Sequence, residues 1–340
     1  MAYTTINKST DYFNTITYTG NGTGSTARTV GFDPDWIWVK NRGGTDSHYL
    51  MDKVRGLDYN IETDTTAAQA RDYLISGTTS TGWTSSNSGE INANNGTFVA
   101  WNWKANGAGS ANTAGSINST VSVNATSGFS IVKYTGTGSA ATIGHGLGVA
   151  PACIIFKDLS ASVDWFVYHQ STGATNRTKL NQTVASSAST FINNTAPSST
   201  VFNTEGGGAT GTNANNFIAY CFAEKTGYSK FSSYTGNGNA DGTFIYTGFK
   251  PAFIMVKRAD DTSNWQINDN KRDVDNVQNT PLMANSSNAE STDTSWDALS
   301  NGFKMRQSYG SKNASGGTYI YMAFAEAPLV GSNNIPATAR

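Results

Sequence analysis

The chain has 340 residues, a length that suggests two or three domains. Charged residues make up only 14% of it, and 23 basic residues nearly balance 24 acidic ones. Because no basic cluster is present, we expect no nucleic-acid partner. The apolar runs fall far short of the roughly 20 residues that span a bilayer, so we expect no membrane insertion. The polar N-terminus predicts no secretion signal.

The main feature of the sequence is a threefold repeat. A Tyr-Thr-Gly-x-Gly motif begins at Tyr18, Tyr134 and Tyr234, and each copy precedes a proline by 16, 17 and 17 residues. That proline opens a hydrophobic run that ends in lysine, and an aromatic segment closes each copy 80, 83 and 85 residues after the tyrosine. The hydrophobic runs are Pro34–Lys40, Pro151–Lys157 and Pro251–Lys257. The Tyr motif, the hydrophobic run and the aromatic segment recur in the same order at near-constant spacing, and we call them the anchors of each copy. This pattern predicts three related tandem domains.

The elements of the first copy are short. Trp36–Val39 and Phe98–Trp103 are rich in aromatic and β-branched residues and bounded by polar ones, which predicts buried strands. Thr65–Leu74 is the best candidate for a helix. Many short strands, turn-rich connections and little helix favour an all-β fold of three tandem β-sandwich, jelly-roll-like domains. We expect Tyr18, Tyr134 and Tyr234 in equivalent strands, and Trp38, Phe156 and Val256 with equivalent facing.

The anchors also predict the boundaries. A low-charge segment between the first two copies reads as a linker, although Thr120–Val123 alternates and is the alternative edge strand. The second and third copies join almost directly, so we expect these two to be held rigidly and the first to hinge. The predicted parts are an N-terminal arm (1–9), sandwich repeats at 10–105, 128–227 and 228–328, the linker or edge strand (106–127) and a C-terminal tail (329–340).

Cysteine and histidine are scarce. Cys153 and Cys221 align with Trp36 and Asn102 of the first copy, so they predict free buried thiols at packing positions. The chain has three histidines, and no cluster at metal-ligand spacing is found. We therefore expect no cofactor.

Acidic residues form the densest cluster of candidate functional side chains. Asp260, Asp261, Asp269, Asp273 and Asp275 gather in the third copy. The first and third copies share an Asp-x-x-Arg motif twelve to fifteen residues after the repeat lysine, at Asp52/Arg55 and Asp269/Arg272. In the second copy the same positions hold His169 and Thr172. A local salt bridge is the favoured interpretation, with a calcium or catalytic role as the alternative.

Tryptophan is the side chain that a sugar-binding surface would use. Trp165 and Trp265 both lie eight residues after the repeat lysine, which favours core positions. Trp296 has no identifiable counterpart in the other copies and is therefore the candidate ligand-binding residue.

Three blocks of sequence resemble a known group of proteins. They are Ala2–Ile6 with Tyr12–Asn14, Phe32–Arg42, and Ala314–Glu326. Across nearly the whole chain the sequence is similar to an uncharacterised repeat family of virion and tail-fibre-like proteins from tailed, particularly marine, bacteriophages. The resemblance implies a place in the virion, with other virion proteins as partners and no catalytic residues to carry over.

These observations favour a non-enzymatic virion structural protein, made in the host cytoplasm, that serves as a tail fibre or host-attachment component. The alternatives are a lectin-like module for host surface glycan, a capsid decoration protein and a surface-polysaccharide hydrolase. For assembly we expect a homotrimer with units stacked along an axis or splayed from one. A single chain whose three units form a pseudo-trimer is the other possibility.

Overall fold

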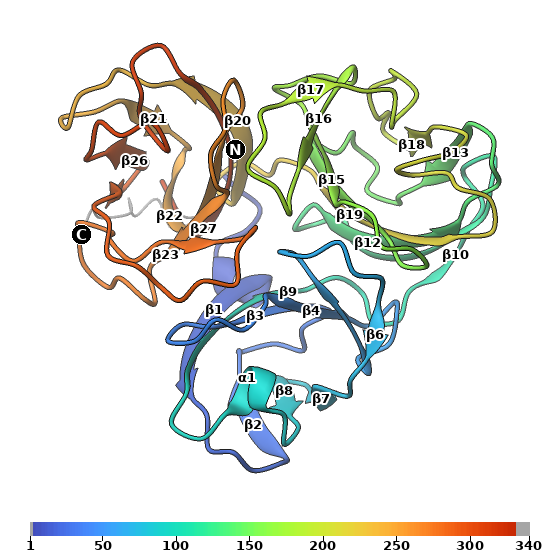
Figure 1. The fold of residues 1–340 in the computed structure, drawn as a ribbon, viewed down its shortest axis with the longest axis horizontal. Coiled ribbons are helices and arrows are strands. Elements are labelled where there is room, and N and C mark those ends of the chain that lie inside the picture. Colours follow the sequence, from blue (N-terminus) through green and yellow to red (C-terminus); the bar gives the residue numbers. More distant parts are fainter. Residues whose placement is uncertain (1–2, 331–340) are drawn as a thin grey trace.

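The computed structural model describes residues 3–330, and its regular structure is almost entirely β-strand. The all-β class predicted from the sequence is confirmed. Within the described residues the strands form six antiparallel sheets, which pack in pairs as three sandwiches, each of one large and one smaller sheet. Figure 1 shows the sandwiches as three lobes around a common centre, coloured blue, green and orange in chain order.

The first sandwich follows a short 3-10 helix, η1 (Ser9–Asp11), and contains the helix α1 (Gly89–Asn92). Its large sheet has the order β1 (Phe13–Thr19), β9 (Thr97–Trp103), β3 (Trp36–Asn41), β4 (Tyr49–Asp52), β5 (Tyr59–Glu62) and β6 (Ala70–Arg71). Its smaller sheet has the order β2 (Thr26–Thr29), β8 (Gly82–Ser85) and β7 (Ile75–Thr79).

The second sandwich has two additional strands at one edge. Its large sheet has the order β10 (Ser110–Asn112), β11 (Ser119–Asn124), β12 (Phe129–Thr135), β19 (Asn216–Phe222), β14 (Cys153–Asp158), β15 (Phe166–His169), β16 (Asn176–Lys179) and β17 (Ser187–Ala188). Its smaller sheet pairs β13 (Ala141–Gly144) with β18 (Val201–Thr204).

The third sandwich repeats the same order without the two additional strands and without a counterpart of β6 and β17. Its large sheet has β20 (Ser229–Thr235), β27 (Thr318–Pro328), β22 (Phe249–Arg258), β23 (Gln266–Asp269) and β24 (Leu282–Met283). Its smaller sheet has β21 (Phe244–Tyr246), β26 (Gly302–Met305) and β25 (Trp296–Leu299).

The three motif tyrosines occupy equivalent places, as the repeat predicts. Tyr18 stands opposite Phe98 in the ladder, and Tyr134 and Tyr234 stand opposite the matching first aromatic of each closing strand. Each tyrosine ring is stacked on that partner, at centroid distances of 5.2, 5.3 and 4.9 Å. The motif glycine is also explained, because a Cβ on Gly20 would lie 2.1 Å from the carbonyl oxygen of Ala93.

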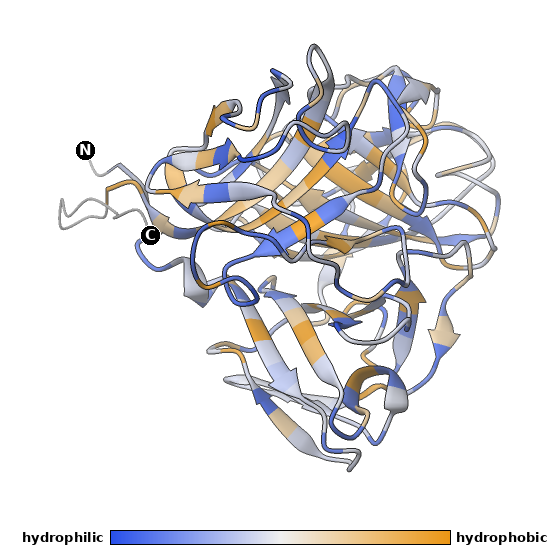
Figure 2. Cartoon of the chain, turned by 60° about the vertical axis from the view of Figure 1, so that its left-hand side comes forward, coloured by the Kyte–Doolittle hydropathy of each residue, from blue (hydrophilic) through white to orange (hydrophobic). Residues whose placement is uncertain are grey.

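The strands predicted as buried have both faces covered. In β3, Ile37 and Val39 face the smaller sheet, whereas Trp36 and Trp38 face the centre of the molecule. The continuous apolar run is thus the signature of a strand that is buried on both sides. Figure 2 shows apolar residues, in orange, along these inner strands, with hydrophilic loops around them.

One expectation of equivalent facing was wrong by a single residue. Trp38 points to the centre, whereas Phe156 and Val256 point into their own sandwiches. The true counterpart of the latter two is Val39, which packs inside the first sandwich. Because side chains alternate along a strand, this slip of one position exchanges the two faces.

One further interpretation of the connections is wrong, and an alternative that the sequence left open is decided. Residues 65–69 have no regular structure and Ala70–Arg71 forms strand β6, so the expected helix at Thr65–Leu74 is absent. The segment 106–127 contains β10 and β11, which extend the second large sheet; the edge-strand alternative therefore holds, and this segment is not a free linker.

The N-terminal arm reaches the third sandwich. Ile6 is buried in the central cluster, and the hydroxyl of Tyr3 donates to the carbonyl oxygen of Gly248 at 2.7 Å. Residues 3–10 thus connect the first sandwich to the last one. Most of the predicted C-terminal tail lies outside the described residues.

Candidate functional site

The inner faces of the three large sheets meet in one apolar cluster. Trp36 of the first sandwich stacks on Tyr220 of the second at a centroid distance of 4.7 Å. Phe324 of the third lies 5.1 Å from Phe13 of the first and 6.0 Å from Phe222 of the second. The units therefore neither stack along an axis nor splay from one, and the first is part of the shared core where we expected a hinge.

Two tryptophans connect neighbouring sandwiches in the same way. The indole nitrogen of Trp165 donates to the backbone oxygen of Glu62 at 2.8 Å, across the boundary between the second and first sandwiches. The indole nitrogen of Trp265 donates to the backbone oxygen of Lys179 at 2.9 Å, across the next boundary. Both rings are buried, which confirms the predicted core positions. Glu62 and Lys179 end equivalent strands, β5 and β16, so these bonds follow a threefold pattern.

At the third boundary the equivalent position holds His48. It also lies eight residues after the repeat lysine, and its Nδ1 accepts from the indole nitrogen of Trp38 at 2.9 Å. Full burial lowers the pKa of His48 well below its usual value, while the nearby backbone of Met283, the end of β24, acts in the opposite direction. His48 therefore stands as a neutral ring where the other sandwiches place tryptophan.

A second set of contacts closes the ring through the backbone. In each case an amide of one sandwich donates to the carbonyl that lies two residues after the repeat lysine of its neighbour. The three bonds run from Gln69 to Leu159 (3.2 Å), from Ser186 to Ala259 (2.8 Å) and from Glu290 to Arg42 (2.8 Å). Each sandwich gives one bond and receives one, which is the pattern of a closed cyclic trimer.

The repeat lysines are buried beside these contacts. The ammonium group of Lys157 donates to the carbonyl of Thr66 at 3.0 Å, and that of Lys257 to the carbonyl of Thr183 at 3.1 Å. Burial lowers the pKa of each to about 8, and it does the same for Lys40. Carbonyl oxygens from the neighbouring sandwich thus help to satisfy two of these cations.

The Asp-x-x-Arg pairs hold buried charges at the same boundaries. Asp52 accepts from the Nε of Arg55 at 2.5 Å, and both side chains are inaccessible to solvent. Tyr220 of the second sandwich donates its hydroxyl to the same carboxylate oxygen at 2.8 Å. The predicted salt bridge is present, and it also joins two sandwiches.

The third sandwich repeats this arrangement with the first. Asp269 pairs with Arg272 at 2.7 Å and accepts from the indole nitrogen of Trp101 at 3.0 Å. In the second sandwich, where the pair is lost, the Nε2 of His169 lies 3.1 Å from the backbone oxygen of Tyr321. Burial lowers the pKa of His169 to about 4, so this ring is neutral at pH 7.

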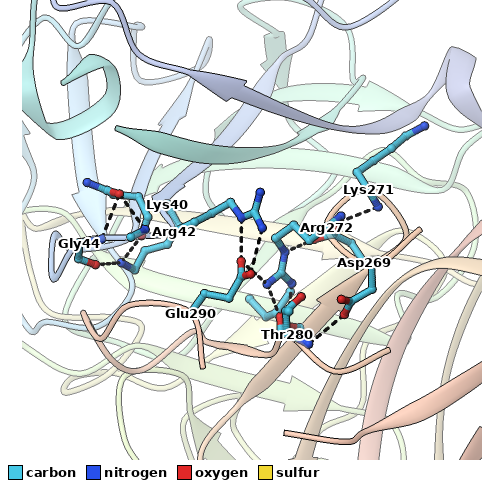
Figure 3. A network of polar contacts seen from close by, with 12 residues as sticks. Lys40, Arg42, Gly44, Asp269, Lys271, Arg272, Thr280 and Glu290 are labelled. Atoms are coloured by element: carbon cyan, nitrogen blue, oxygen red, sulfur yellow. Dashed lines mark hydrogen bonds and ion pairs between the residues drawn. The ribbon is translucent and has the colours of Figure 1, made fainter. Parts of the chain in front are cut away.

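A network of charged groups crosses the boundary between the third and first sandwiches (Figure 3). Arg42 makes a bidentate ion pair with Glu290, with N–O distances of 2.7 and 2.9 Å. The Nη1 of Arg272 lies 3.4 Å from the same carboxylate and also donates to the carbonyl of Thr280. This network has no equivalent at the other two boundaries among the described residues.

Four acidic residues of the third copy, Asp260, Asp261, Asp269 and Asp273, make structural contacts. Asp273 accepts from the amides of Asn279 and Thr280, and Asp260 and Asp261 pair with Arg258. Among residues 3–330 no group of three or more His, Cys, Asp or Glu side chains could hold a metal ion. Both cysteines are free and buried, as predicted, and burial raises the pKa of each thiol. No helix in the described part of the chain is long and apolar enough to cross a membrane.

Trp296 does not form a binding surface. It is 1% exposed and packs on Phe303 inside the third sandwich, so its ring offers no face to a sugar. It does have a counterpart, since it stands opposite Met305 as Ile75 of the first sandwich stands opposite Ser85. A register shift after Ile75 in β7 hides this equivalence from sequence spacing.

A family model described as "Domain of unknown function (DUF7483)" matches residues 8–328. The chain belongs to the DUF7483 family. The DUF7483 model covers all three sandwiches as one domain, in agreement with their shared core. No curated protein matches the chain.

Proposed function

We propose that this protein is a structural component of a bacteriophage particle, in a tail fibre or another host-attachment assembly, where it presents its sandwiches outward. The observation that carries the proposal is the closed ring of three sandwiches about one apolar core. The resemblance of Phe32–Arg42 and Ala314–Glu326 to tail-fibre-like proteins provides the biological context.

A ring of this kind suits a particle surface for a physical reason. Attachment proteins often act as trimers, and here one chain supplies threefold geometry without an assembly step. The inner faces of the three large sheets pack on one another, so partners must bind the outer sheets and loops. Other virion proteins are the proposed partners, and the proposed location is the virion, after synthesis in the host cytoplasm.

The proposed role is non-enzymatic. Asp52 and Asp269 are buried and paired with arginine, which leaves neither free to act as an acid or base on a polysaccharide. A hydrolase therefore remains the weaker alternative. A capsid decoration protein would use the same fold at a different place on the particle.

The test is the location of the protein in purified particles. Particles from infected cells are banded in a density gradient, and the protein is identified by mass spectrometry and by immunogold labelling. We expect it to follow infectivity through the gradient, with gold at the tail or fibre. Gold on the capsid shell would favour the decoration role, and absence from infectious particles would refute the proposal.

A further inference from the structure

A cleft opens along one side of the first sandwich, between the edge strands of its two sheets. It has a volume of about 370 Å³ and is lined by residues 14–18 of β1, residues 27–29 of β2 and Lys271 of the third sandwich. Pockets of roughly 300 Å³ and more are large enough for small ligands. The lining includes Thr17, an exposed residue whose hydroxyl can hydrogen-bond to a ligand, and Asn14, whose side-chain nitrogen donates to the carbonyl of Val30 at 2.7 Å.

Arg28 places an unneutralised charge in this cleft. The side chain is buried, with its guanidinium carbon 3.9 Å from the centre of the Tyr18 ring. Its Nη2 donates to the side-chain oxygen of Asn92 at 2.6 Å, whereas its buried Nε has no hydrogen-bond partner. No carboxylate among the described residues forms an ion pair with Arg28. Its Nη2 also lies 3.4 Å from the hydroxyl of Ser85, so the contacts of the guanidinium are with neutral groups. A buried cation that no carboxylate neutralises is costly, which makes Arg28 a candidate contact for an anionic ligand.

The repeat shows that the same fold is built elsewhere without an arginine at this position. Arg28 stands opposite Trp83 in its sheet, and the residues opposite the matching aromatics of the other sandwiches are Ile143 and Ile245. Both isoleucines are buried in their cores. The first sandwich therefore carries a cation where the same fold is built twice with an aliphatic side chain.

Lys271 adds a second cation from the neighbouring sandwich. It makes no ion pair with the described carboxylates, although its backbone amide donates to Asp269. Glu326 lies across a small neighbouring cavity, where it accepts from Asn270 and lies 3.7 Å from Lys250. The matching position in the first sandwich is Val54, so this cation is also outside the repeat pattern.

The first sandwich has no strand that covers the outer edge of β1. In the second sandwich β11 pairs with β12 along its length, at the edge that corresponds to the free edge of β1. A cleft also exists beside β12, where Val54 and Lys133 occupy the places of Lys271 and Thr17. It contains one cation, against two in the first sandwich.

We propose that this cleft, with Arg28 and Lys271 as its cations and the β1 side chains as hydrogen-bonding groups, binds a carboxylate-bearing sugar of a host-surface polysaccharide. An acidic sugar combines the two features that the lining matches, a negative charge and several hydroxyl groups. The choice of ligand source rests on the proposed attachment role, whereas the anion-binding chemistry rests on the cleft alone.

The test uses the full chain and defined oligosaccharides in isothermal titration calorimetry. We expect tetra-galacturonate to bind and neutral galactotetraose not to bind, with affinity falling as salt is added. Arg28→Ile and Lys271→Val introduce the residues of the matching positions, so both should fold. Each should weaken binding by about tenfold or more, the effect of losing a hydrogen bond to a charged group.

Lys133→Thr is the matched control, because it removes the cation of the cleft beside β12 and should leave the affinity unchanged. Equal loss with Lys133→Thr, or no loss with either cleft variant, would overturn the assignment. Binding of sulfated oligosaccharide or inorganic sulfate in place of tetra-galacturonate would refute the carboxylated sugar as ligand.

Particle location separates this inference from the proposed function. A protein found on the particle that binds no acidic saccharide would refute the cleft proposal alone. A protein absent from particles that still binds tetra-galacturonate through Arg28 would refute the attachment role alone.

Discussion

The hydroxyl of Tyr220 in the second sandwich donates a 2.8 Å hydrogen bond to the carboxylate of Asp52 in the first. Asp52 is fully buried with Arg55, so the bond joins two sandwiches at a desolvated ion pair. Trp101 makes the corresponding bond to Asp269. Loss of one hydrogen bond to a buried charge of this kind is costly, because solvent cannot reach the pair and take the place of the lost partner.

The first prediction follows from this contact. Tyr220→Phe removes the donor and keeps the ring on Trp36, and we expect the free energy of unfolding to fall by about 2 kcal/mol, as for hydrogen bonds to charged groups. Urea denaturation at pH 7 measures the change. Tyr309→Phe, at a ring that is 65% exposed, is the control and should leave the stability unchanged. An equal effect of the two substitutions would contradict the proposed importance of the contact.

The second prediction concerns the shared core. Phe222→Ala leaves a cavity among Phe129, Phe231 and Phe324, so we expect a loss of about 3–5 kcal/mol. Hydrogen exchange should accelerate in all three sandwiches, because all three pack on this cluster. Phe303→Ala is the matched variant, since Phe303 lies in the core of the third sandwich alone. Faster exchange confined to the second sandwich in Phe222→Ala would show that the units unfold separately.

The sequence predicts what is local and repeated. Runs such as Trp36–Val39 identify strands, because burial on both faces leaves a continuous apolar pattern. Contacts between the sandwiches have no such pattern: Asp52 and Tyr220 are 168 positions apart. His48 is also hidden, because an imidazole replaces the indole of the other copies. The register shift after Ile75 changes the sequence spacing, so the equivalence of Ile75 and Trp296 cannot be found from the sequence and Trp296 has no visible counterpart there.

The third prediction concerns the ion pairs drawn in Figure 3. Glu290→Gln keeps the shape and removes the charge that faces Arg42 and Arg272. We expect a loss of about 1–2 kcal/mol, because the glutamate is largely buried and bonded to both guanidinium groups. The control is Asp11→Asn, which breaks the exposed pair with Lys8 and should cost less than about 0.5 kcal/mol. Chemical denaturation of both variants at low and high salt provides the comparison.

The fourth prediction is a loss of stability in acid. Burial holds the pKa of His169 at about 4, against an ordinary value near 6.5 in the unfolded chain. The unfolded state therefore binds more protons between these values, and stability falls as the pH drops from about 6.5 to 4. The shift corresponds to about 3 kcal/mol for this residue at the acid end. Burial also lowers the pKa of His48 and His145, which adds to the effect.

Thermal unfolding between pH 7 and pH 4 measures this dependence. His169→Gln retains an amide donor for the backbone oxygen of Tyr321 and removes the titrating group, so the melting temperature should fall less steeply with acid. The variant keeps His48 and His145, and its profile should remain partly sloped. Identical profiles for the variant and the natural chain would exclude His169 as a source of the acid sensitivity.

The last prediction concerns assembly, where the sequence favoured a homotrimer. A homotrimer of sandwiches forms when each has an apolar face to cover, and such faces are the usual source of closed cyclic contacts. Here the inner faces of all three large sheets already cover one another, and each boundary is closed by a backbone hydrogen bond and by an indole hydrogen bond, which at the third boundary is the bond from Trp101 to Asp269. At the outer edges of the large sheets, β1, β10 and β20 carry exposed polar residues, which disfavours pairing between chains. We therefore expect light scattering of the purified protein at micromolar concentration to give the mass of one chain, 36.1 kDa. A mass of three chains would support the homotrimer and would require contacts through the outer sheets.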